Sequence, residues 1–194
     1  MDWSSLADFI PSLALGIALA ACAGLRAWLP LLLASLLARA GWLELGPSFQ
    51  FLASNKALLL FAVATVIEIV GDKVPVVDHA LDAIGTPLRP AAGALLAASV
   101  MGHVSDPLTA LVLGTAVGAP AALVPHAAKT ALRAASTTFT GGLANPILSL
   151  IEDGASFVLF VLAVLVPLVV VGLLALALLL ITRRLRHFSS VTAA

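Results

Sequence analysis

Two polar segments of this chain hold many of the side chains that could bind or transfer ions. The first, residues 71–90, together with Glu68 just before it, interleaves acids with bases: Glu68, Asp72, Lys73, Asp78, Asp82 and Arg89. On helical backbone, acids four residues apart share a face, and two such carboxylates repel each other unless a cation or proton lies between them. These residues are therefore either salt-bridged helix ends at a membrane surface or a buried network beside a permeation path, which is where ionisable residues at membrane depth are usually found.

The second polar segment, residues 126–154, is basic at its start and rich in hydroxyl groups at its centre. Its polar residues recur every three or four positions, which predicts one helical face: His126, Lys129, Arg133, Thr137 and Thr140. An amphipathic helix that lies on the membrane surface is one interpretation. The opposite face is mostly alanine, however, and this composition favours burial against other helices.

The centre of the second segment predicts a helix break. Gly141 and Gly142 interrupt the pattern, and Asn145 followed by proline suits the start of a new helix, with the asparagine as its cap. We therefore expect two short helices that meet at the glycines inside the protein. The residues expected to face a common polar space are Lys129, Arg133, Thr137 and Asn145.

The composition identifies the chain as an integral membrane protein. Of its 194 residues, 61% are hydrophobic and only 10% are charged, whereas a soluble domain is about half apolar and a quarter charged. Ten basic residues balance ten acidic ones, so there is no excess positive charge to bind nucleic acid. Cys22 is the single cysteine, which excludes a disulfide framework.

The apolar runs predict one membrane domain over residues 1–194, with about 20 residues per crossing. We expect spans near 9–38, 51–70, 87–104, 107–125 and 155–182, with polar segments at 71–90 and 126–154. The first span should break near Arg26 and Pro30, and the last must tilt or kink at Pro167. The expected fold class is an all-α integral membrane protein with about five transmembrane helices and broken or re-entrant segments, six crossings being the alternative.

Charges and small residues near the spans predict orientation and packing. The basic stretch 183–187 follows the last span, which predicts a cytoplasmic C-terminus and a multi-pass protein of the cell inner membrane. Arg26 would be costly against hydrocarbon, so we expect it inside the protein, paired with Glu68, Asp72 or Glu152. The small residues of 16–24 and 114–118 predict close helix contacts, within the chain or between copies in a homo-oligomer.

Four motifs occur together over most of the chain. They are GLRAWLPLL from Gly24, E-x3-DKVP-x2-D from Glu68, RPAAG from Arg89 and TGGLANP-x2-S-x2-ED from Thr140. Together they resemble a bacterial membrane-protein family catalogued as domain of unknown function 4126. The resemblance implies a compact multi-pass protein and no particular activity. The polar residues that it marks are Arg26, Glu68, Asp72, Lys73, Asp78, Arg89, Asn145, Glu152 and Asp153.

The residues favour a small transporter or channel for a polar solute or a lipid headgroup. An anionic or phosphate-bearing solute would use Lys129, Arg133, the hydroxyl-rich turn and free N–H groups of helix ends. Burial of Glu68 beside Asp72 disfavours its charge, so we expect proton uptake and proton coupling. The candidate binding residues are Arg26, Glu68, Asp72, Lys73, Asp78, Arg89, Lys129, Arg133, Thr137, Asn145 and Glu152.

Three other functions are weighed against this one. A divalent-cation transporter would use the carboxylates of Glu68, Asp72, Asp78 and Asp82 as hard oxygen ligands. A structural or partner-binding membrane subunit would use the small-residue faces. An intramembrane enzyme is the least favoured, because the sequence has neither an HExxH nor a GxSxG motif. We therefore expect no enzymatic activity and no cofactor.

Overall fold

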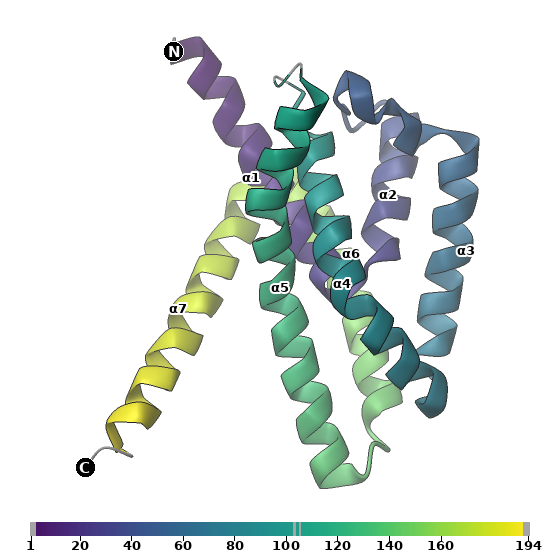
Figure 1. Ribbon diagram of the computed structural model, residues 1–194, viewed down its shortest axis with the longest axis vertical. Coiled ribbons are helices and arrows are strands. Elements are labelled where there is room, and N and C mark those ends of the chain that lie inside the picture. The colour runs from purple at the N-terminus through teal and green to yellow at the C-terminus, as the bar shows by residue number, and fades with distance from the viewer. Residues whose placement is uncertain (1–2, 103, 105, 192–194) are drawn as a thin grey trace.

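The computed structural model describes residues 3–102, 104 and 106–191, and every regular element in those ranges is a helix (Figure 1). In chain order the elements are α1 (Trp3–Leu25), α2 (Trp28–Arg39), the 3₁₀ helix η1 (Pro47–Ala53), α3 (Asn55–Gly71), α4 (Pro75–Ser99), α5 (Pro107–Thr140), α6 (Asn145–Leu165) and α7 (Pro167–Val191). The predicted all-α class is confirmed.

The predicted first span, 9–38, is two helices that fold back on each other. Helix α1 ends at Leu25, and α2 starts at Trp28 and returns toward the end of the bundle where α1 begins (Figure 1). Residues that follow α2 accordingly line the same cavity as Ser12 of α1. Pro30 lacks the N–H that would continue the helix through Arg26. The expected break is therefore a hairpin, and Arg26 lies at its tip.

The two predicted polar segments are helical, and this corrects several predicted boundaries. Helix α4 runs through 75–99 despite its internal prolines, so segment 71–90 and span 87–104 are largely one helix. Helix α5 continues past the predicted end of its span at 125 to Thr140. Helix α6 begins at Asn145, where a helix start was predicted, and runs without a break into the last predicted span, which was expected to begin at 155. The helices continue because their charged residues are buried against other helices. Of the two expectations for the last span, a tilt or a kink at Pro167, the structure shows an interruption at the proline, since α6 ends before Val166 and α7 begins at Pro167.

The helices fit a membrane protein. Within the described residues, α5 and α6 are each long and apolar enough to cross a bilayer, and η1 with α3, bent by 57°, forms a third candidate. Shorter apolar helical stretches cover Phe9–Leu25, Trp28–Arg39 and Val171–Leu180. Leucine, isoleucine and valine side chains are exposed on the outer faces of α3, α5, α6 and α7, as expected of surfaces that contact hydrocarbon.

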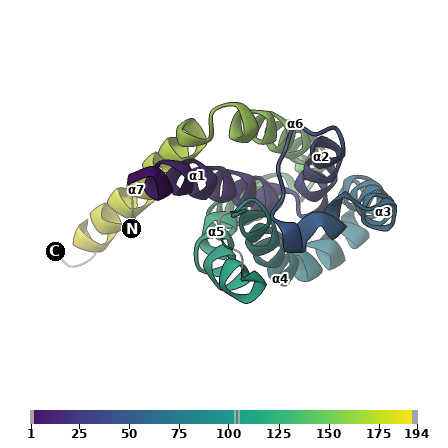
Figure 2. The same cartoon turned by 90° about the horizontal axis from the view of Figure 1, so that it is seen from above.

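Glycines bring α1, α4 and α5 into close contact at the centre of the bundle (Figure 2). A Cβ on Gly24 would lie 2.1 Å from the carbonyl oxygen of Ala122, and one on Gly118 would lie 2.4 Å from the carbonyl oxygen of Gly93. The predicted close helix contacts are therefore made within one chain. Helices of the same chain thus cover these small-residue faces.

Candidate functional site

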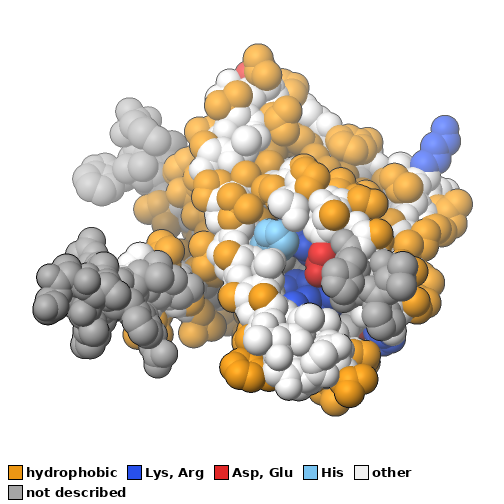
Figure 3. Space-filling model, turned by 60° about the horizontal axis from the view of Figure 1, so that its bottom comes forward, with side chains coloured by type: hydrophobic (Ala, Val, Ile, Leu, Met, Phe, Trp, Pro, Cys, Tyr) orange, Lys and Arg blue, Asp and Glu red, His pale blue; other side chains and the backbone are white. Residues whose placement is uncertain are grey.

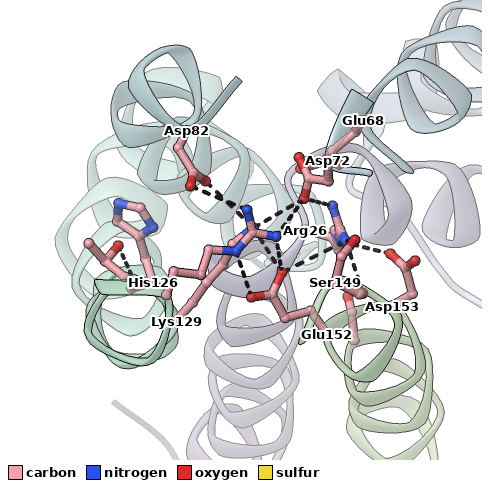
Figure 4. Close-up of polar contacts among 12 residues, drawn as sticks. Arg26, Glu68, Asp72, Asp82, His126, Lys129, Ser149, Glu152 and Asp153 are labelled. Carbon is pink, nitrogen blue, oxygen red and sulfur yellow. Dashed lines mark hydrogen bonds and ion pairs between the residues drawn. The ribbon is translucent and has the colours of Figure 1, made fainter. Parts of the chain in front are cut away.

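Ten charged side chains converge around the tip of the α1–α2 hairpin, and we call them the charged cluster (Figure 4). Its members are Arg26, Glu68, Asp72, Lys73, Asp82, Arg89, Lys129, Arg133, Glu152 and Asp153. They comprise five of the ten basic and five of the ten acidic residues of the sequence. They come from the hairpin tip, α4, α5, α6 and the C-terminal end of α3.

Arg26 is fully buried at the centre of the cluster. Its guanidinium forms an ion pair with Asp72, and Nε lies 2.8 Å from Asp153 Oδ1. Nη2 donates to the carbonyl oxygen of Ser149 at 3.1 Å and to its Oγ at 2.9 Å. The predicted burial of Arg26 inside the protein, with an acidic partner, is thus confirmed.

Glu68 binds the backbone of the hairpin rather than the guanidinium of Arg26. Oε1 accepts a hydrogen bond from the N–H of Ala27 at 3.0 Å, and Oε2 accepts one from Trp28 at 3.2 Å. Helix α2 has no side-chain cap of its own, and its first N–H groups need acceptors. The carboxylate of Glu68 therefore caps α2 from another helix, where a negative charge also stabilises the helix dipole.

Lys129 and Arg133 come from one buried face of α5. Arg133 donates to both carboxylate oxygens of Glu152, at 3.1 and 2.9 Å, and to Asp72 at 3.2 Å. The Nζ atom of Lys129 lies 3.1 Å from Glu152 and 3.5 Å from Asp72. Since Arg26 also reaches Asp72 and lies 3.8 Å from Glu152, three cations share two carboxylates at the core of the cluster.

The cluster is closed on the hairpin side and opens on the opposite side. The side chains of Arg26 and Asp72 are 0% exposed, whereas that of Asp82 is 35% exposed. Asp82 lies within 3.7 Å of Lys129 and 3.4 Å of Arg133. Figure 3 shows acidic, basic and histidine side chains together in a hollow of the surface. Solvent can thus reach the cluster beside Asp82.

Eight of the eleven candidate residues meet in the cluster, and two others, Thr137 and Asn145, do not. Thr137 is exposed on another face of α5, while Ser136 takes the buried position beside Arg133. Asn145 starts α6 without capping it, and its side-chain oxygen has no hydrogen-bond partner among the described residues. The expected polar space at the glycine turn is wrong because α5 continues to Thr140, past the cluster. The side chain of Asp78 lies outside the part of the structure that is described.

Three cluster contacts come from residues outside the candidate set. Asp82 lies two helical turns before Arg89 on α4, a spacing that could have indicated a shared face. Asp153 pairs with both Arg26 and Lys73. Ser149 precedes Asp153 by one helical turn, but a single serine in an apolar helix gives no signal for its bond to Arg26.

The geometry gives no support to a divalent-cation site. Among the residues whose side chains are described, no three histidine, cysteine, aspartate or glutamate side chains are placed to hold a metal ion. The carboxylates are instead interleaved with basic groups. A metal ion would have to displace those cations to reach its oxygen ligands.

The comparisons with known proteins identify the family but no activity. No curated protein and no solved structure matches the chain. The family described as domain of unknown function (DUF4126) matches residues 13–187, a range that includes every member of the charged cluster. The chain therefore belongs to the DUF4126 family.

Proposed function

We propose that this protein is a membrane transporter for a small anionic solute, and that uptake of a proton by the charged cluster drives binding of the anion. The observation that carries the proposal is the core of the cluster, where Arg26, Lys129 and Arg133 share the carboxylates of Asp72 and Glu152. The positive charges of these three side chains would attract an anion. The anion would take the place of the carboxylates of Asp72 and Glu152.

Stability alone does not account for such a cluster. Removing charges from water is costly, and well-packed apolar residues often stabilise a fold as well as a buried ion pair does. Ionisable residues within membrane proteins accordingly mark substrate pathways and proton relays. The cost of burying seven of the ten charged side chains of the cluster supports a role in binding.

We assign the proposed proton coupling to Glu152, because three cations share this carboxylate. Its Oε2 lies 2.9 Å from Arg133, 3.1 Å from Lys129 and 3.8 Å from Arg26. A proton on this carboxylate removes its charge and leaves the three cations with one anionic partner fewer. An external carboxylate or phosphate then replaces it by charge-assisted hydrogen bonds. Binding of the proton and binding of the anion are thereby favourable to each other.

The surroundings of the cluster support alternating access. A cavity of about 480 Å³ lies toward the other end of α1, lined by Ser12, Leu15, Trp42 and Glu44 among others. The close-packed stretch of α1, with Ala18 to Gly24 buried, separates this cavity from the cluster. We propose that the α1–α2 hairpin moves, and that this movement opens the charged cluster to one side of the membrane while closing it to the other. In this proposal α3 to α7 cross the inner membrane, with a cytoplasmic C-terminus after Arg183.

Uptake into proteoliposomes tests the function. Inorganic phosphate, sulfate, acetate and succinate are offered with and without an inward proton gradient. We expect saturable uptake of at least one anion that the gradient accelerates. Arg133→Gln should abolish this uptake, whereas Glu152→Gln should retain uptake but lose the response to the gradient. Arg39→Gln is the matched control, because Arg39 is exposed and outside the cluster.

Two results would overturn the proposal. One is uptake of every anion at the rate of empty liposomes. The other is an Arg133→Gln variant that transports as fast as wild type. A partner-binding subunit is then the better function, and the lower part of α7, which extends away from the other helices (Figure 1), supports it through exposed residues such as Leu173, Leu176 and Leu180.

A further inference from the structure

The cavity of about 480 Å³ toward the N-terminal half of α1 has the size of a site for a small organic molecule. It is lined by α1, by the segment that joins α2 to η1, by the residues that follow α4 and by the last turn of α6. The segment between α2 and η1 runs across this end of the bundle (Figure 2). Leucine and valine side chains form part of the lining, and Ser12 and Glu44 add polar groups.

Trp42 and Glu44 lie on the same side of the segment between α2 and η1. The chain is not helical there, and Trp42 and Glu44 are exposed whereas Leu43 and Leu45 are buried. Side chains two positions apart on such backbone point to the same side. Both exposed residues line the cavity, and Trp42 is 79% exposed. The cavity therefore has an accessible indole ring and a carboxylate on one wall.

The charge around this cavity is negative. Among the described residues that line it, Glu44 is the only one with a charged side chain. Arg39, the base nearest to it along the chain, turns toward α3 and donates to Asn55 Oδ1 at 2.6 Å. Val100 follows the last residue of α4, and Val164 lies in the last turn of α6. The negative ends of two helix dipoles thus lie at the cavity, and together with Glu44 they favour a cation.

We propose that this cavity binds an alkylated ammonium cation such as choline, with the ammonium group between the Trp42 ring and the Glu44 carboxylate. The face of a tryptophan ring attracts such a cation, and the alkyl groups would contact Leu15, Val100 and Val164. A metal ion fits less well, because it requires several oxygen ligands. The site does not rest on the proposed transport activity, although a bound cation would offset the negative charge that an anion meets on entering from this side.

Calorimetric titration of the wild-type protein in nonionic maltoside micelles tests the proposal. The ligands are choline and its uncharged carbon analogue, in which a tert-butyl group replaces the trimethylammonium group. We expect saturable binding of choline, about tenfold tighter than that of the analogue, because the analogue lacks the charge that the ring and the carboxylate attract. Absence of choline binding, or equal affinity for the two ligands, would overturn the proposal.

Two variants assign the binding to the cavity. Glu44→Gln and Trp42→Leu should each weaken choline binding about threefold to fivefold. Asp106→Asn removes an acid and Phe51→Leu an aromatic ring, both at exposed positions outside the cavity lining, so these matched controls should bind choline like wild type. All four positions are exposed, so the variants should fold. An affinity for choline that is unchanged in Glu44→Gln or in Trp42→Leu contradicts the assignment.

The same titration in nanodiscs identifies the source of the cation. In phosphatidylcholine nanodiscs, choline should bind as in micelles if the cavity takes a free solute. Its binding should be lost if a lipid headgroup already occupies the cavity, and phosphatidylglycerol nanodiscs should then restore it. A loss that phosphatidylglycerol does not reverse would contradict the proposal.

Discussion

The contact between Gly24 and α5 yields the sharpest stability prediction. A Cβ at this position would lie 2.1 Å from the carbonyl oxygen of Ala122 and 2.9 Å from its carbonyl carbon. Both atoms are backbone, so α1 and α5 would have to separate by about 1 Å or more to restore an ordinary contact. Arg26 follows two residues later, and the hairpin tip would move with α1.

The magnitude follows from two opposing effects. Alanine in place of a helical glycine gains about 1 kcal/mol of helix propensity, while overpacking a close-packed interior costs roughly 1–3 kcal/mol. Because backbone atoms obstruct Gly24, we expect the upper end of that cost in Gly24→Ala. Gly154 of α6 has nothing within 4 Å of its Cβ position. Gly154→Ala should therefore keep the propensity gain, and it provides the matched control.

Thermal unfolding measures the difference between these variants. Cys22 is the only cysteine of the sequence and is fully buried, so a thiol-reactive fluorophore reports the opening of α1. We expect Gly24→Ala to melt roughly 10 °C below Gly154→Ala, at about 2–4 °C per kcal/mol for a chain of this size. Gly16→Ala, whose Cβ would lie 3.2 Å from the backbone of Ala97, should fall between them. Equal melting temperatures for Gly24→Ala and Gly154→Ala would refute the packing argument.

Three further predictions use the same unfolding assay. Glu68→Ala removes the cap of α2 and should cost about 1–2 kcal/mol, whereas no loss would mean that water replaces the carboxylate. Ser149→Ala removes a hydrogen bond to the buried guanidinium and should cost about 1.5–3 kcal/mol, while Thr137→Ala at an exposed position should change stability by less than about 0.5 kcal/mol. Hydrogen bonds from the side chain and backbone of Thr109 lower the pKa of Asp106. The stabilisation by the Asp106 carboxylate should therefore be complete above the ordinary aspartate pKa and be lost as the pH falls through the lowered pKa of the folded protein. Asp106→Ala should remove this contribution to the loss of stability at low pH.

The sequence alone predicted the membrane class, the helical fold and most of the cluster. Apolar composition and periodicity are local properties, so they can be recognised in the sequence without knowing how the helices pack. Arg26 could be placed inside the protein because a guanidinium facing hydrocarbon is costly in any arrangement of the helices. The same reasoning marked Glu68, whose charge interrupts an apolar run, whereas the spacing of polar residues along one helical face marked Lys129.

Helix boundaries and partners depended on the tertiary structure. The sequence suggested that the membrane spans end where the polar segments begin, yet α4 and α5 are each continuous through their charged residues because neighbouring helices supply opposite charges. Thr137 and Ser136 are adjacent in the sequence, and only the rotation of α5 against α4 and α6 decided that the serine is buried. The bond between Arg26 and Ser149 joins residues 123 positions apart. Such pairings depend on the glycine contacts among α1, α4 and α5, which set how closely the helices pack, and no local pattern encodes that arrangement.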